Sequence, residues 1–226
     1  MTILNVGPVE RAGLNAFLDR VVALDDRAAV RLQARGTVAG VWAGPPFGVL
    51  ALRPVALLDS AEVDITLSAQ RMIEALQSVA GTGEVAVALP QSVLGSPWAA
   101  LLPPQAGWAL EAEVQVAVVV DQVRVAVDGF RRRVDALPAE GRTSAALEAV
   151  ADELWRAPSV GPVPLRAAHA ANQLGFLGRE GLVSAYRSGS WVRLGCPGGS
   201  VLARLDDPGT LGGLGSLDVL GMFTPR

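Results

Sequence analysis

The chain has 226 residues, of which 50% are hydrophobic and 18% are charged, and its net charge at pH 7 is −3. This composition excludes an intrinsically disordered chain and supplies enough apolar side chains for a sizeable core. The negative charge balance argues against a bulk nucleic-acid coat or a binder of anionic membranes.

All nineteen basic residues are arginine, which together with abundant Ala, Val, Leu, Gly and Pro indicates the codon bias of a high-GC genome. The single cysteine, Cys196, excludes an intrachain disulfide framework and suits a reducing cytosol. No uncharged apolar run is as long as a membrane span, and the amino terminus lacks the pattern of a secretory signal. We therefore predict a cytoplasmic protein without membrane contact.

The first hundred residues are predicted to form an α+β unit. Near the amino terminus, five apolar residues recur at helical spacing: Leu14, Phe17, Leu18, Val21 and Val22. Residues 28–57 predict three strands, with breaks at Arg35-Gly36 and at 44–48. Residues 63–67, 68–79 and 84–89 then predict a strand, a helix capped by Ser68, and a further strand.

Residues 113–137 are rich in valine, which favours strands, but their spacing predicts a long amphipathic helix. Seven apolar residues follow a heptad pattern: Val116, Val120, Val123, Val127, Phe130, Val134 and Leu137. We expect this face either to be buried on the core or to form a seam between two copies. A second helix follows at 143–157, with Thr143 or Ser144 as its N-cap.

The segment after Val160 repeats landmarks of the amino-terminal segment. Each copy starts with Val-Gly-Pro-Val, at 6–9 and 160–163, and later resumes with Val-Leu-Ala, at 49–51 and 201–203. A helix and predicted strands lie between these landmarks, and the strand breaks of the second copy fall at Ser188-Gly189 and at 195–199. The repetition predicts duplicated β-α-β-β-β (strand-helix-meander) units on either side of the long helix, with the two meanders packed together as a pseudo-symmetric core.

The loop "GCPGGSVLAR", Gly195–Arg204, holds the only cysteine among several glycines. It lacks the lysine of a P-loop and the following helix of a Rossmann loop, so phosphate binding is not expected. One cysteine and one histidine cannot build a structural zinc site. We predict no catalysis, metal, cofactor or small-molecule ligand, and treat Cys196 as part of a turn. A cysteine-dependent enzyme, with a Cys196–His169 pair, stays an alternative.

The helix at 164–178 offers a second functional interpretation. One of its faces carries side chains suited to reading base edges or phosphates: Arg166, His169, Asn172 and Gln173. Downstream, "FLGREGLVSAYRSGSWVRL" resembles the end of a recognition helix and the wing of winged-helix regulators, with Arg187 and Arg193 on the hairpins at 183–205. That resemblance implies a DNA-binding regulator.

Two departures from the winged-helix pattern weaken this interpretation. The connection at 157–163 is longer than the usual turn between the two helices. Gly175 and Gly178 fall where the recognition helix would have to continue. We therefore favour a helix with a solvated polar face, followed by a meander.

The pattern "AVRLQARG…VWAGPPFGVLALR…VDITLSA…LGFLG…GSWVRL" resembles a family of uncharacterised proteins from high-GC actinobacteria, which carries no established activity to transfer. At fold level, the strand-helix-meander unit also resembles the repeated modules of DNA sliding clamps, which line their channel with basic helices. The first helix of this chain carries Glu10, Arg11, Asp19 and Arg20, whose charges balance. The resemblance therefore implies a fold and no clamp function.

We thus predict four parts: an α+β unit at 1–100, a connector and helical hairpin at 101–158, a second strand-helix-meander unit at 159–205 and a Gly-rich tail at 206–226. The expected function is that of a non-catalytic cytosolic interaction or scaffold protein that self-associates or binds a protein partner. Aromatic candidates for the partner surface are Trp98 and Trp108 in the connector and Phe223 in the tail. The alternative function is DNA binding.

Overall fold

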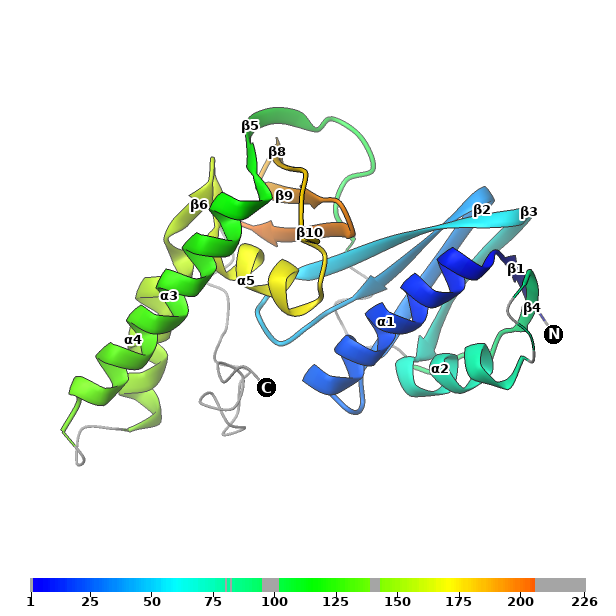
Figure 1. The fold of residues 1–226 in the computed structure, drawn as a ribbon, viewed down its shortest axis with the longest axis horizontal. Helices are drawn as coiled ribbons and strands as arrows, with labels where there is room; N and C mark the ends of the chain where they lie inside the picture. The colour runs from blue at the N-terminus through cyan, green and yellow to red at the C-terminus, as the bar shows by residue number, and fades with distance from the viewer. Residues whose placement is uncertain (1, 80, 82, 95–101, 139–142, 206–226) are drawn as a thin grey trace. The chain divides into compact units, whose positions relative to one another are not determined.

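The computed structural model describes residues 2–79, 81, 83–94, 102–138 and 143–205. The chain divides into two compact units, one made of Met1–Pro45 and Leu50–Pro103, the other of Pro46–Val49 and Pro104–Arg226. Both combine helices with antiparallel strands, which confirms the predicted α+β class (Figure 1). The predicted tail at 206–226 lies outside the described residues, and no helix among those described is long and apolar enough to cross a membrane.

The first unit is a four-stranded antiparallel sheet with two helices. Its elements are β1 (Ile3–Val6), α1 (Pro8–Leu24), β2 (Ala29–Ala43), β3 (Leu50–Ser68), α2 (Ala69–Ser78) and β4 (Val85–Ala88). The strand order is β4-β1-β3-β2. Helices α1 and α2 lie side by side (Figure 1), and Leu14 and Met72 meet Leu32 and Val41 of the sheet in the core.

The predicted break at Arg35-Gly36 is wrong. Strand β2 runs through this point and only shifts its register against β3 between Gly36 and Val38. Gly36 has a φ of +65°, a left-handed conformation that only glycine adopts readily, so it forms a β-bulge within the strand. The second predicted break is confirmed, because β2 ends at Ala43 and β3 begins at Leu50.

The helix after β3 begins as predicted. Ser68 is its N-cap, and the Ser68 Oγ accepts a hydrogen bond from the Arg71 backbone N–H at 3.4 Å. The strand predicted at 63–67 is the end of the long β3. There, Arg31 and Asp64 form a two-point ion pair at 2.8 Å, and this hydrogen bonding lowers the pKa of Asp64.

The second unit holds a four-stranded antiparallel sheet, a helical hairpin and a short buried helix. Its elements are β5 (Ala109–Gln115), α3 (Val116–Ala136), α4 (Ser144–Arg156), β6 (Pro158–Val160), β7 (Val163–Pro164), α5 (Leu165–Gln173), β8 (Leu182–Ser188), β9 (Trp191–Cys196) and β10 (Gly199–Arg204). The strand order of the sheet is β10-β9-β8-β5, and β6 and β7 form a separate two-stranded ribbon. The three-stranded meander predicted for this copy is confirmed, with breaks at Ser188-Gly189 and near Gly198.

The long helix is confirmed, but its buried face is shifted from the predicted one. Val116, Val123, Phe130 and Val134 are buried as expected, whereas Val120 is 40% exposed. Val119 and Ala126 are buried in addition. The N-cap of the next helix is Thr143, whose Oγ1 accepts a hydrogen bond from the Ala146 N–H at 3.2 Å.

Candidate functional site

Helix α5, the predicted recognition helix, is a core element of the second unit. Every residue from Leu165 to Ala171 is buried, including Arg166 and His169. Alanines at 167, 168, 170 and 171 make the helix thin enough for other elements to surround it. Arg166 and His169 are therefore not available to a DNA duplex, which corrects the sequence-based hypothesis for these two residues.

Aromatic rings surround His169. Its imidazole lies 4.7 Å from the Trp155 ring and 5.2 Å from the Phe47 ring, the latter in an edge-on arrangement. The Phe130 ring lies 6.5 Å from the Trp155 ring. Burial lowers the pKa of His169 to about 4, so the imidazole is neutral near pH 7. His169 is thus a packing residue of an aromatic cluster.

Arg166 donates a hydrogen bond from Nη2 to the Arg204 carbonyl oxygen at 3.3 Å, which links α5 to the end of β10. The other four residues of the DNA-binding hypothesis are not buried in the core as Arg166 and His169 are. Asn172 and Arg187 are exposed, and Gln173 and Arg193 are half-buried. The Arg187 Nε donates to the Gly189 carbonyl oxygen at 3.2 Å. For these four residues DNA contact remains a hypothesis.

Trp108, the described member of the three aromatic candidates, packs on the outer side of the sheet. The Arg193 guanidinium lies 5.0 Å from the Trp108 ring and 4.3 Å from the Tyr186 ring. The Trp108 Nε1–H donates to the Pro104 carbonyl oxygen at 3.0 Å. This half-buried arrangement holds residues 104–108 against β8 and β9. Trp98 and Phe223 lie outside the described residues.

The loop that holds Cys196 is a tight turn between β9 and β10. Burial raises the pKa of the Cys196 thiol to about 12, which disfavours the reactive thiolate. The Gly198 N–H donates to the Phe176 carbonyl oxygen at 2.8 Å. Among the described residues, no group of three or more His, Cys, Asp or Glu side chains is placed to hold a metal ion.

Gly198→Ala is expected to destabilise the protein by about 1–3 kcal/mol. A Cβ at this position would lie 2.9 Å from the Phe176 Cα and 3.1 Å from its carbonyl oxygen, and backbone atoms cannot move aside cheaply. The measurement is urea unfolding followed by circular dichroism. Gly83→Ala is the matched control, because no atom lies within 4 Å of its added Cβ. Equal stability of the two variants would contradict this packing.

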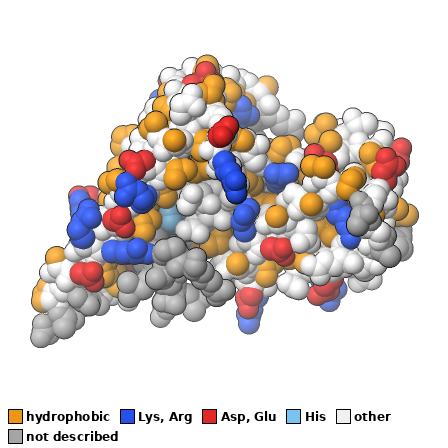
Figure 2. All heavy atoms as spheres, viewed as in Figure 1, with side chains coloured by type: hydrophobic (Ala, Val, Ile, Leu, Met, Phe, Trp, Pro, Cys, Tyr) orange, Lys and Arg blue, Asp and Glu red, His pale blue; other side chains and the backbone are white. Residues whose placement is uncertain are grey.

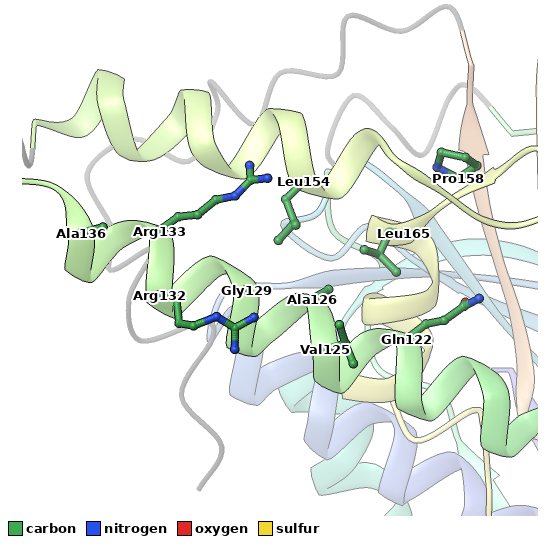
Figure 3. Close-up of a pocket in the computed structure, with 10 residues that line it drawn as sticks. All are labelled: Gln122, Val125, Ala126, Gly129, Arg132, Arg133, Ala136, Leu154, Pro158 and Leu165. Atoms are coloured by element: carbon green, nitrogen blue, oxygen red, sulfur yellow. The ribbon is translucent and has the colours of Figure 1, made fainter.

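A groove of about 560 Å³ runs along α3 in the second unit (Figure 3). Helix α3 forms its floor, while α4, β6 and α5 supply the walls through Leu154, Pro158 and Leu165. The α3 residues that line it are Gln122, Val125, Ala126, Gly129, Arg132, Arg133 and Ala136. At the rim, Arg133 Nη1 and Glu153 Oε1 form an ion pair at 3.1 Å.

The prediction of a heptad seam did not include this groove. Five of its α3 residues follow a second heptad pattern, offset from the first: Gln122, Val125, Gly129, Arg132 and Ala136. Val118 extends this pattern by one step toward the amino end of the helix. The spacing of these residues, 4, 3, 4, 3 and 4 from Val118 to Ala136, could have revealed the pattern in the sequence. Gly129 and Arg132 hid it, because a search for apolar residues passes over them. Both heptad faces belong to one helix, and the buried one packs on the unit's own core.

Residues 2–100 match the model of a domain of unknown function (DUF8010), and residues 103–208 match the model of another domain of unknown function (DUF8185). None of the curated proteins matches the chain in sequence.

Among solved structures, a DnaN sliding clamp from Bartonella birtlesii is similar with a TM-score of 0.56 at 11% identity, over 92% of this chain and 65% of the clamp. A sliding clamp from Caulobacter crescentus gives a TM-score of 0.55 at 14% identity, over 100% of this chain and 69% of the clamp. Another structure of the clamp from that organism gives 0.53 at 16% identity, over 91% and 65%. The chain thus has a sliding-clamp-like fold, as the strand-helix-meander resemblance implied, and spans about two thirds of the clamps' length.

Proposed function

We propose that the chain is a non-catalytic, cytoplasmic scaffold protein that uses a sliding-clamp-like fold for protein interaction and associates with itself. The observation that carries this proposal is a set of exposed apolar side chains on β5, α3 and β8 of the second unit. They are Leu110, Val118, Val120, Val125 and Leu182. Val118 and Val125 stand seven residues apart on the same face of α3, and exposed apolar side chains grouped in this way are typical of protein–protein contacts.

The distribution of charge favours a protein partner over DNA. The first unit offers no basic helix for a DNA backbone, because the acidic and basic residues of α1 balance, as do Arg71 and Glu74 of α2. On the helical hairpin, Arg124 pairs with Asp121 and Arg156 pairs with Asp152. Figure 2 shows arginines and acidic residues interspersed over α3 and α4. An arginine that is already paired with a carboxylate neutralises DNA phosphates poorly and so releases few of their counterions. We therefore expect this surface to bind DNA weakly.

The proposal also divides the second half of the chain into two parts with different roles. The connector and helical hairpin at 101–158 would present most of the interaction surface, and the part at 159–205 would support it and contribute Leu182. Trp98 and Phe223 are retained as candidate contact residues on this proposal.

Light scattering of the full chain, with and without a generic DNA duplex at low salt, tests the proposed function. We expect a mass of about twice the 23.4 kDa chain mass, unchanged by the duplex. A strictly monomeric mass would contradict self-association. A mass increase with duplex that disappears at higher salt would instead support the DNA-binding alternative through Asn172, Gln173, Arg187 and Arg193.

A further inference from the structure

Helix α3 carries a narrow stripe that the described residues of its unit leave uncovered. The stripe follows the second heptad pattern, and Val118 and Val125 on it are 46% and 52% exposed. Its other members are Gln122, Gly129, Arg132 and Ala136, all of which line the groove. A heptad-spaced stripe of this width suits contact with one other helix, because it keeps the same face toward a partner over several turns.

The stripe has an open space above Gly129 (the hole) next to the projecting side chain of Val125. At Gly129, an added Cβ would meet only the tip of the Arg132 side chain, at 3.9 Å, so the space above this glycine is open. Val125 projects one turn before it, on the same side of the helix (Figure 3). Small residues at 126, 129 and 136 keep the floor of the groove low. Such a surface allows a second helix to approach closely.

We propose that the occupant of this stripe is the α3 helix of a second copy, packed antiparallel about a two-fold axis. This rests on the proposed self-association and assigns it a surface. A two-fold contact must be self-complementary. Placing Val125 opposite Gly129 of the second copy also places Gln122 opposite Arg132 and Val118 opposite Ala136. Every pair then joins a large side chain to a small one, or a hydrogen-bond acceptor to a donor.

Charge supports the same register. Within the described part of the chain, Arg124, Arg131 and Arg133 form ion pairs, whereas Arg132, the fourth arginine of α3, forms none. In the antiparallel register, the Arg132 guanidinium faces the Gln122 Oε1 of the second copy. This oxygen accepts a hydrogen bond from the Ser159 hydroxyl at 2.7 Å and has a second lone pair for the guanidinium. The pair occurs twice across the two-fold axis, so it contributes to orientation as well as affinity.

Mixed-disulfide formation tests the register directly. In a Cys196→Ser background, separate chains carrying Val125→Cys and Gly129→Cys are mixed and mildly oxidised. We expect a covalent dimer mainly in the mixture, because two copies of residue 125 would lie too far apart along the helices for a disulfide. Val9→Cys mixed with Gly129→Cys is the control, since Val9 is 81% exposed on α1. Equal cross-linking of the control, or none in the test mixture, would overturn the register.

Arg132→Glu and Gly129→Leu test the surface without cross-linking. Arg132→Glu places a carboxylate against the Gln122 Oε1 of the second copy, and Gly129→Leu fills the space above residue 129, so each is expected to weaken the dimer about tenfold or more. Arg124→Glu on the same helix is the matched control, because residue 124 lies off the stripe, and circular dichroism verifies folding. A wild-type dimer whose dissociation constant is unchanged by both variants would overturn this surface but leave the proposed scaffold function intact. A wild-type monomer would overturn self-association itself.

Discussion

Trp155→Ala is expected to lower the free energy of unfolding by about 3–5 kcal/mol. Trp155 is 2% exposed, and its ring lies 6.5 Å from the Phe130 ring and 4.7 Å from the His169 ring. Removing the indole leaves a cavity in the aromatic cluster that α3, α4 and α5 build together. The three helices are close-packed around this cluster, so the neighbouring side chains can move only part of the way into the cavity. Urea unfolding followed by far-UV circular dichroism measures the loss.

Trp108→Ala is the matched control for Trp155→Ala. The Trp108 ring is half-buried and contacts the Arg193 guanidinium at 5.0 Å, an interaction that contributes about 0.5–1 kcal/mol at such sites. The loss is therefore expected to be clearly smaller than for Trp155. An equal loss in the two variants would contradict the assignment of Trp155 to the core and Trp108 to the outer side of the sheet.

The second large effect is a fall in stability as the pH decreases from about 6.5 to 4. Burial lowers the pKa of His169 to about 4, whereas an exposed histidine titrates near 6.5. Between these values the unfolded chain binds a proton that the folded chain excludes, so protons favour unfolding. The difference corresponds to on the order of 3 kcal/mol, fully present above pH 6.5 and lost progressively toward pH 4.

Unfolding curves at half-unit pH steps measure this effect, and His169→Phe is the comparison variant. Phenylalanine can keep the contacts with Trp155 and Phe47 but has no proton to bind, so its stability should change much less over this range. The lowered pKa of Asp64 acts in a lower window, below the ordinary carboxyl range, because Arg31 stabilises its charged form. Parallel pH profiles for wild type and His169→Phe would show that His169 is not the responsible group.

Local patterns predicted the elements better than the burial of their faces. In α3, two apolar residues often stand at adjacent positions, as Val119 and Val120 do. The heptad count selected Val120, but packing buries Val119 and leaves Val120 partly exposed. Which of two neighbouring valines faces the core depends on α4 and α5, and no local spacing contains that information.

The site residues illustrate the same limit. Arg166 and His169 were assigned to a surface because polar residues on a helix usually face water. The burial of His169 depends on Phe47 and Trp155, and Arg166 bonds the Arg204 carbonyl at the end of β10; these residues come from other elements of the fold. The meander around Gly198 was predictable, because turn chemistry is local and the first copy has prolines and glycines at the equivalent place. The duplicated landmarks likewise pointed to the clamp-like fold that the solved structures show.

Self-association of the full chain is the central claim, and sedimentation equilibrium tests it most directly. Measured over a hundredfold range of concentration, the weight-average mass should rise from the 23.4 kDa of one chain toward twice that value and then level off. A mass that stays at one chain over the whole range would contradict the account.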